Sequence, residues 1–394
     1  MKNIAVIFGG KSVEHDVSVI TGVQVLNALD KQKYNVYPIY INRQGRWFFS
    51  ESFFDLNALK NFNEKAKNAH EVLINFNDKT LYKKNRNKLK KLCEPECVIL
   101  AVHGGNGENG ALQGLLACCD IPFSGTAVLG SAICMDKIIT KYLLQNLGFK
   151  VCEFCALSEQ DSSKGINFCI DKILGGKSKK PEDKFLKFPI IIKPANLGSS
   201  IGINICNNKK ELANAIDIAH QYDSRILAEE AITNKIEINA SVLGDGIGCE
   251  VSLLEKPVSG QQFLTFDEKY IGSKSTKNKD NMREIPAKIG EEQEKLIKTY
   301  AKDIFMHFNL SGVVRIDFII DNDKNEVYVN EINTIPGSLS FYLWDKAELG
   351  ESKKTFGELL AQLVSIAITE HNEKSKLRAD YQSNVLQNYK GGAK

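Results

Sequence analysis

Short apolar runs alternate with segments of helical spacing in the first third of the chain. Residues 3–8, 36–41 and 98–102 are apolar runs that predict strands. Residues 17–29 carry an apolar side chain at every third position from Val17 to Leu26, and 111–119 form a second predicted helix. Strands that alternate with helices predict a parallel sheet with both faces covered.

Glycines follow two of these predicted strands directly. Gly9-Gly10 follows the first strand, and His103-Gly104-Gly105 follows the third. Loops at the carboxyl ends of strands carry ligand sites in such sheets, so both positions are candidates for function. Residues 43–95 between them are polar and rich in lysine and asparagine, and we expect irregular structure there around the apolar island 47–49.

The pattern changes after Pro122. Residues 137–147 and 209–220 predict helices, whereas 226–228, 236–243, 248–253, 313–320 and 327–329 predict strands joined mostly by turns. This arrangement is typical of an α+β fold with antiparallel strands. The charged segment 175–187 predicts a surface loop, and the polar tail from about residue 373 predicts a loose end.

Residues 188–202 predict two strands joined by a loop of small residues. Lys193 stands at the end of the first strand, and Leu197-Gly198-Ser199-Ser200 follows it. Glycine allows close approach of the backbone to a ligand, and successive N–H groups in such a loop bind anions. A phosphate site with Lys193 as its cation is one interpretation, and a plain hairpin with a surface lysine is the other.

A second polar pattern lies on the strands near residues 315 and 331. Arg315 and Asp317 are two positions apart, as are Glu331 and Asn333 on the following strand, so each pair points to one face. Two carboxylates and an amide oxygen are ligands of the kind that Mg²⁺ uses together with water and phosphate oxygens. The alternative is a solvent-facing strand pair with salt bridges.

Residues 266–287 form a long polar segment without periodicity, which predicts a lid over a site or else a disordered linker. Lys269 and Tyr270 are its candidate functional residues.

Composition narrows the function classes. The chain has 394 residues, enough for two or three packed cores, and its net charge of +3 is too small to indicate a nucleic-acid partner. No apolar run has the length of a signal-peptide core or a membrane span, so we expect a cytoplasmic protein. The ten cysteines include a C-x-x-C at 152–155 and a C-x-x-x-C at 93–97, and we interpret them as reduced, mostly buried thiols.

Seven separated motifs occur in an order that resembles the D-alanine–D-alanine ligases of the ATP-grasp superfamily. The motifs are FGGKSVEHDVS at 8–18, HGGNGENGALQG at 103–114, MDK at 135–137, IIKPANLGSSIG at 191–202, EKY at 268–270, RID at 315–317 and NEINTIPGS at 330–338. The resemblance implies a three-domain ATP-grasp architecture with an N-terminal parallel-sheet domain. We expect boundaries at 1–124, 125–228 and 229–394, with ATP between the second and third domains.

The resemblance also implies a reaction and a set of site residues. ATP would phosphorylate the carboxylate of one D-alanine, and the amine of a second would displace phosphate. Lys137, Lys193, Gly198 and Ser200 would hold the ATP phosphates, and Glu229, Glu230, Ile232 and Glu237 the adenosine. Two Mg²⁺ or Mn²⁺ ions would bind to Asp317, Glu331 and Asn333. Arg315 and the N–H group of Gly337 would stabilise the oxyanion.

The remaining implied roles concern the amino acids. Glu14 would anchor the ammonium group of the first D-alanine near His103, and Glu14, Ser199 and Tyr270 would form a hydrogen-bonded trio. Lys269 would contact phosphate or the second carboxylate. The family has a serine a few residues after the Pro-Gly turn, where this chain has Tyr342, so Ser340 is the other candidate for that carboxylate.

The resemblance further implies a homodimer, and Tyr270 favours an amine as the second substrate. The alternatives are a related ligase that uses D-serine or D-lactate and a binding protein without turnover. A binding protein without turnover would not need Arg315 to stabilise an oxyanion. A nicotinamide-binding enzyme is disfavoured because Gly9-Gly10 lacks the G-x-G-x-x-G pattern.

Overall fold

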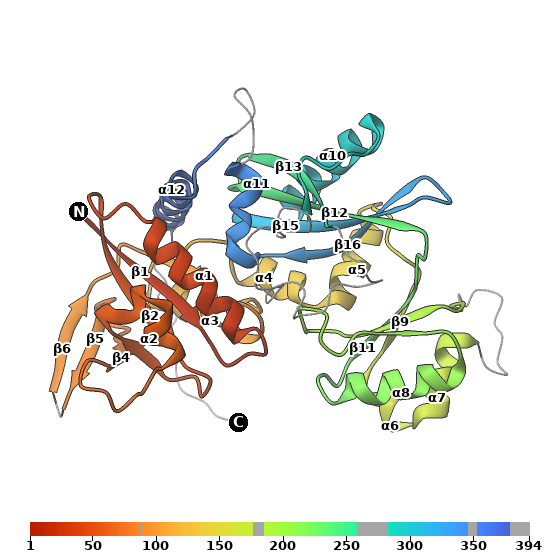
Figure 1. The fold of residues 1–394 in the computed structure, drawn as a ribbon, viewed down its shortest axis with the longest axis horizontal. Coiled ribbons are helices and arrows are strands. Elements are labelled where there is room, and N and C mark those ends of the chain that lie inside the picture. Colours follow the sequence, from red (N-terminus) through yellow and green to blue (C-terminus); the bar gives the residue numbers. More distant parts are fainter. Residues whose placement is uncertain (87, 176–184, 258–282, 346–352, 379–394) are drawn as a thin grey trace, which may run out of the picture.

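Three sheets, each built from a successive part of the sequence, organise the protein (Figure 1). The computed structural model describes residues 1–86, 88–175, 185–257, 283–345 and 353–378. The mixture of an N-terminal α/β sheet with largely antiparallel sheets after it is the fold class that the sequence predicts.

The first sheet has seven strands in the order β6-β5-β4-β3-β2-β1-β7. Its β1 pairs in parallel with both β2 and β7, as the alternating pattern predicts. The expectation of irregular structure over 43–95 is wrong, because this region adds antiparallel strands to the same sheet. The elements of this part are β1 Lys2–Gly9, α1 His15–Ala28, β2 Tyr34–Ile41, β3 Trp47–Phe49, η1 Glu51–Phe54, α2 Leu56–Lys60, β4 His70–Ile74, β5 Leu81–Asn85, β6 Lys88–Cys93, β7 Cys97–Ala101, η2 Gly105–Gly107 and α3 Ala111–Cys118.

The second sheet has four strands in the order β10-β9-β11-β8 and is antiparallel throughout. The predicted hairpin over 190–205 is confirmed as the β9–β10 pair. Helices cover one side of this sheet, and their buried faces form a separate apolar core with it. The elements are β8 Phe154–Leu157, α6 Glu159–Ser163, α7 Ile166–Leu174, β9 Ile190–Pro194, β10 Asn204–Cys206, α8 Lys209–His220 and β11 Ile226–Glu230.

The third sheet has five strands in the order β14-β13-β12-β15-β16. Helices α4, α5 and α10 contact it, and its core includes Leu144 and Phe149 from the segment that precedes the second sheet. The segment before the second sheet therefore packs against the third. The elements are α4 Val128–Met135, α5 Lys137–Asn146, β12 Lys235–Gly244, β13 Cys249–Pro257, β14 Arg283–Glu284, α10 Glu291–His307, β15 Gly312–Asp321, β16 Glu326–Asn333, η4 Gly337–Ser340, α11 Tyr342–Asp345 and α12 Phe356–Ser375.

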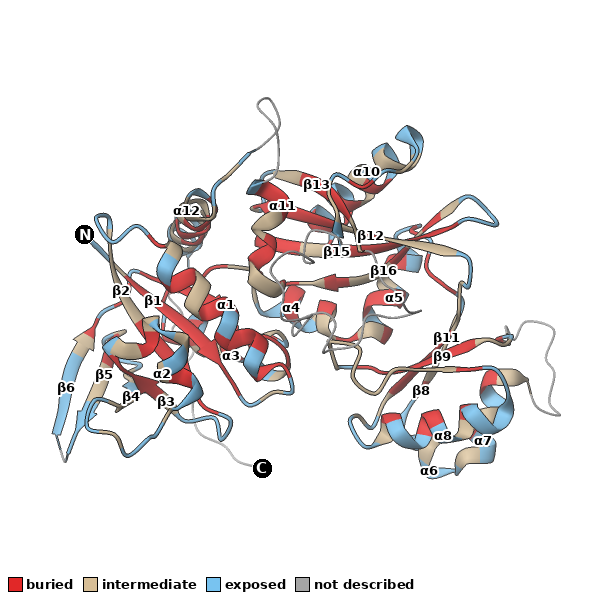
Figure 2. Ribbon diagram, viewed as in Figure 1, coloured by how far each residue is buried: buried red, intermediate tan, exposed pale blue. Residues whose placement is uncertain are grey.

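Helix α12 belongs by packing to the first sheet, although it is the last helix in the described part of the chain. Leu359, Leu360, Leu363 and Val364 are buried in the same apolar core as β1 and β7. Figure 2 shows the buried residues of α12 on its inner side and the buried faces of the three sheets. The C-terminal segment thus completes the N-terminal core.

The cysteines match the interpretation as reduced thiols. All ten are free, and seven are buried, including Cys93 and Cys97. Burial raises the pKa of Cys97 to about 12, which keeps the unreactive thiol form. Among the described residues, no helix combines the length and apolarity that a membrane span requires.

Candidate active site

Two residues in the loop between β9 and β10 have a left-handed backbone conformation. Ser199 and Ser200 have positive φ angles of 54° and 59°, which non-glycine residues rarely adopt. Backbone strain of this kind persists where surrounding contacts enforce it, and it is common at ligand sites. Lys193 lies in β9 directly before this loop, so the loop and its cation adjoin as the sequence predicts.

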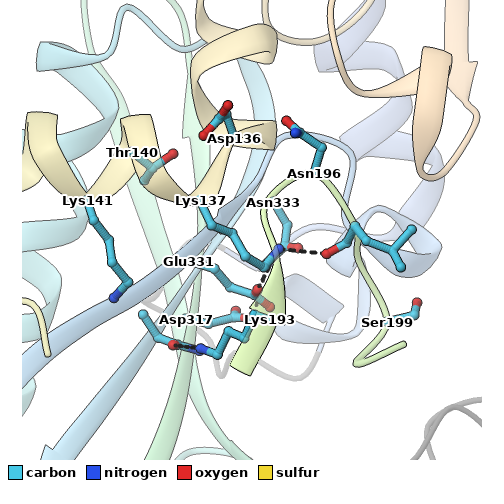
Figure 3. Close-up of polar contacts among 12 residues, drawn as sticks. Asp136, Lys137, Thr140, Lys141, Lys193, Asn196, Ser199, Asp317, Glu331 and Asn333 are labelled. Atoms are coloured by element: carbon cyan, nitrogen blue, oxygen red, sulfur yellow. Dashed lines mark hydrogen bonds and ion pairs between the residues drawn. The ribbon is translucent and has the colours of Figure 1, made fainter. Parts of the chain in front are cut away.

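Helix α5 presents Lys137 to the same loop (Figure 3). Asp136 caps the helix by accepting hydrogen bonds from the N–H groups of Ile138 and Ile139, both at 3.0 Å, and it also pairs with Arg225. Lys137 follows the cap, donates to the Leu197 carbonyl at 2.7 Å and lies 3.7 Å from Glu331. The MDK motif therefore fixes a lysine between the β9–β10 loop and the third sheet.

A buried group of three charges lies behind Lys193. Glu229 pairs through one carboxylate oxygen with Lys193 and through the other with Lys141. Burial alone would raise the pKa of Glu229, but the two ammonium groups outweigh it and lower the pKa to about 2. Lys141 was not among the predicted site residues, although its position four residues after Lys137 on a predicted helix puts both lysines on one face.

Four polar residues share one face of the third sheet, as their spacing predicts. Arg315 lies opposite Asn333, and Asp317 lies opposite Glu331. Arg315 donates two hydrogen bonds to Asp317, at 2.6 and 2.7 Å, and Asn333 donates to the same carboxylate at 3.1 Å. This part of the site is a hydrogen-bonded cluster centred on Asp317.

The donor set of this cluster fits a magnesium ion in chemical type. Asp317, Glu331 and Asn333 offer hard oxygen ligands of the kind that Mg²⁺ prefers. Over the described ranges, no group of three His, Cys, Asp or Glu side chains is arranged to hold a metal ion. Magnesium sites of this kind usually include phosphate oxygens and water as further ligands.

Glu14 connects the first sheet with the β9–β10 loop. Its carboxylate accepts a hydrogen bond from the Ser199 hydroxyl, 185 residues away in the sequence. A Cβ atom built on Gly198 would lie 2.8 Å from Oε2 of Glu14 and 3.0 Å from Oε1, and Gly104 adjoins the same carboxylate. The glycines of two motifs thus allow the carboxylate to lie between two backbone segments.

His103 is a buried link between α1 and the Pro-Gly turn. Its Nδ1 donates to the Ile335 carbonyl at 2.9 Å, so its Nε2 accepts from the Thr21 hydroxyl at 2.8 Å. Thr21 in turn accepts from the Ser338 N–H group at 3.1 Å. Burial lowers the pKa of His103 to about 4, which fits a neutral ring with both nitrogens engaged by the protein.

The turn after Pro336 is left-handed over three residues that are not glycine. Ser338, Leu339 and Ser340 have φ angles of 50–52°, and the turn that begins at Gly337 contacts α1 and β15. Ser340 is fully buried, with 0% of its surface exposed. Tyr342 is only partly buried, so it is the more accessible of the two candidates for the second carboxylate.

Tyr342 belongs to a second charged cluster that sequence reasoning missed. Its hydroxyl donates to Glu255 at 3.1 Å, and Arg283 stacks over its ring at 4.2 Å. Arg283 also lies 3.3 Å from the other Glu255 oxygen, and Asn239 donates to Glu255 at 3.0 Å. Asn239 is opposite Asp317 in the sheet, so this cluster continues the polar row of the site.

The predicted adenosine segment lies at the junction of the second and third sheets. Glu230 ends β11 and accepts from the Lys187 N–H group at 2.9 Å, and Ile232 lies in the connection to β12. Glu237 is on β12 and pairs with Lys235 at 2.6 Å. Lys269 and Tyr270 lie outside the described residues, as does most of the predicted lid.

Glu108, in the HGGNGENG motif, is a further site residue that the motif assignment left without a role. It accepts a hydrogen bond from the Gly104 N–H group at 2.5 Å. Burial and the neighbouring Glu14 carboxylate raise the pKa of Glu108. Two carboxyl groups therefore adjoin Gly104.

Comparisons with known proteins agree along nearly the whole chain. The family model described as D-ala D-ala ligase N-terminus matches residues 3–126, and the model described as D-ala D-ala ligase C-terminus matches residues 143–365. A D-alanine–D-alanine ligase of Thermosipho melanesiensis is 36% identical over 389 residues, with 98% of both chains covered.

Two solved structures are similar as well. The D-alanine–D-alanine ligase from Coxiella burnetii has a TM-score of 0.74 at 29% identity and covers 95% of this chain and 98% of its own. The VanG D-Ala:D-Ser ligase from Enterococcus faecalis has a TM-score of 0.73 at 29% identity, with 93% and 99% covered.

Proposed function

We propose, from the premise that this chain belongs to the D-alanine–D-alanine ligase family, that it joins two D-alanine molecules with consumption of ATP. The product would be the dipeptide that enters peptidoglycan precursor synthesis. ATP converts the carboxylate of the first D-alanine into an acyl phosphate, and the amine of the second then displaces phosphate. The protein must position both substrates, stabilise charge and exclude water.

The nucleotide would lie between the second and third sheets. Lys193 lies near the end of β9 and Lys137 contacts the Leu197 carbonyl, so both ammonium groups lie on the β9 side of the loop, and the N–H groups of Gly198 to Ser200 would face the phosphates. Asp317, Glu331 and Asn333 would hold Mg²⁺ or Mn²⁺. A metal ion bound there neutralises phosphate charge and polarises the transferred phosphoryl group.

The amino acids would lie between the phosphate loop and the first sheet. Glu14 would receive the ammonium group of the first D-alanine, with Glu108 beside it. Arg315 and the Gly337 N–H group would stabilise the negative charge that develops when the amine attacks the acyl phosphate. His103 would act by holding the Pro-Gly turn in place, because both of its ring nitrogens are engaged.

The hydrogen bond between Ser199 and Glu14 carries this proposal. A phosphate loop and an amino-acid anchor that share a hydrogen bond are what an enzyme needs to phosphorylate a bound amino acid. A protein that merely binds a nucleotide would gain nothing from this connection. We propose that Tyr270 completes the trio and that Lys269 acts from the same lid segment.

A D-serine-using ligase is the second candidate, because VanG is similar over nearly its whole length. Tyr342 occupies the place where the resemblance predicts a serine for the second carboxylate, so specificity must be measured. The three domain boundaries, the homodimer and the cytoplasmic location remain predictions.

Phosphate release tests the proposal directly. Purified protein with Mg²⁺ should release phosphate only when both ATP and D-alanine are present, and the dipeptide should form in equal amount. Absence of release would refute the ligase proposal. Competition of D-alanine with D-serine or D-lactate at neutral pH should still give mainly D-alanyl-D-alanine, whereas a main product with D-serine or D-lactate would establish the alternative.

A further inference from the structure

The lysine at position 141 is buried more completely than either lysine assigned to ATP. Its side chain is 1% exposed, and its partner Glu229 is 2% exposed. A charged side chain loses its hydration when it is buried, so it is retained only where a partner compensates. For Lys141, the ion pair that compensates is the one with Glu229.

The pair connects helix α5 with the second sheet. Lys141 lies on α5, which contributes Leu144 to the core of the third sheet and Ile138 to a small apolar cluster with Leu227 of β11. Glu229 lies on the same strand β11. Lys137 is one helical turn earlier on α5, and both lysines extend from that helix in Figure 3. One helix therefore presents one lysine to the phosphate loop and the other to Glu229.

The charge of the group depends on Lys141. Glu229 alone would neutralise Lys193, and the resulting neutral pair would attract phosphate weakly. With Lys141 on the other oxygen, the three charges sum to one positive charge, and it lies at the end of β9. Lys193 also approaches the Asn330 side-chain oxygen at 3.3 Å, so its ammonium group is oriented from two sides.

We propose that Lys141 is a positioning residue of the nucleotide site: it holds Glu229 so that this carboxylate orients Lys193 without cancelling its attraction for the ATP phosphates. The inference rests on the proposed function for the assignment of ATP to this site. It goes beyond that function by adding a residue that need not touch the nucleotide. A purely structural tie between the two sheets is the competing explanation.

The affinity for nucleotide in the absence of D-alanine distinguishes a positioning role of Lys141 from a purely structural one. We would measure the dissociation constant of ADP by calorimetry for wild type, Lys141→Met, Lys141→Gln and Lys141→Arg. Loss of the charge should weaken ADP binding at least about tenfold in the Met and Gln variants, whereas Arg should stay within about threefold of wild type. The KM for D-alanine at saturating ATP should change less than about twofold in all of them.

A double-variant cycle tests the route through Glu229. Lys141→Met introduced into a Glu229→Gln background should cost clearly less ADP affinity than it costs in wild type, because no carboxylate charge then remains to be shared. Equal losses in both backgrounds would overturn the proposal. Such a loss would show that Lys141 does not act through Glu229.

The Gln variant keeps the test decisive if the Met variant fails to fold. Glutamine can still donate a hydrogen bond to Glu229 and so preserves a structural tie, but it carries no charge. A folded Lys141→Gln protein that binds ADP as wild type does would refute the proposal. Failure of the ligase proposal would look different: wild type would bind ADP and release no phosphate with D-alanine.

Discussion

An added methyl group at Gly198 should impair the amino-acid site while leaving the fold intact. The Cβ of Gly198→Ala would lie 2.8 and 3.0 Å from the two Glu14 oxygens, against 3.4 Å or more in ordinary contact. The carboxylate must therefore retreat by about half an ångström. It cannot do so freely, because Gly104 adjoins it on another side and Ser199 is bonded to it.

The expected decrease in kcat/KM follows from the hydrogen bond between Ser199 and Glu14, which the displaced carboxylate would lose. A hydrogen bond to a charged group contributes about 1.5–3 kcal/mol, so its loss predicts a decrease in kcat/KM of about 10- to 100-fold. Phosphate release at saturating ATP with varied D-alanine measures this, and most of the change should appear in the KM for D-alanine. The melting temperature should fall by only a few degrees, because the clash is with the end of one side chain and alanine restricts the unfolded chain more than glycine does.

Gly246→Ala is the matched control. Gly246 lies in an exposed turn, a Cβ atom there would meet nothing within 4 Å, and its backbone does not have a positive φ. This variant should keep wild-type kinetics. If Gly198→Ala also keeps kcat/KM within about twofold of wild type, the close packing of Glu14 against Gly198 has no role in catalysis.

Three further outcomes follow from the site. Arg315→Ala should lower kcat by about 10²–10³-fold, and an equal loss of ADP affinity would remove this arginine from the oxyanion role. Because burial lowers the pKa of His103 to about 4, the unfolded chain binds a proton that the folded protein does not, and stability should fall as the pH decreases from about 6.5 towards 4. Chemical denaturation should show a smaller decrease over that range for His103→Asn, and an equal decrease would contradict the assignment. Glu229→Ala should destabilise the protein by about 3–5 kcal/mol, because two buried ammonium groups lose their partner, whereas Glu230→Ala should cost less than about 1 kcal/mol in the same denaturation assay.

The parts of the fold that the sequence predicted are those specified by local periodicity. The β9–β10 hairpin and the shared face of Arg315 and Asp317 follow from alternation along a strand, which needs no knowledge of distant residues. The helix predicted over 137–147 is equally local, since it follows from apolar spacing along the segment that forms α5.

The strands over 43–95 were not predicted because lysines interrupt the alternation of apolar and polar residues that indicates a strand. β6 carries lysines at 88, 90 and 91 and is an edge strand of the first sheet, where charged side chains prevent further pairing. Such a strand has little apolar pattern of its own. Its pairing with β5 depends on the rest of the sheet, and a prediction from the local sequence pattern does not take the rest of the sheet into account.

The contacts within the site could not be derived from local pattern. Glu14 and Ser199, or Lys141 and Glu229, come together through the packing of separate sheets. The resemblance predicted the first of these contacts because it links motifs that are far apart. Nothing in the motifs indicated the second, since a lysine on a helix is ordinarily a solvated residue.

The return of α12 to the first sheet sets an order for synthesis of the protein. Leu359, Leu360 and Leu363 fill a core whose other members come mainly from the first 121 residues of the chain. In a nascent chain that emerges from the ribosome, this N-terminal core therefore lacks the side chains of α12 while the two later sheets are translated and fold. The region that is made first therefore completes its native packing only after α12 has been synthesised.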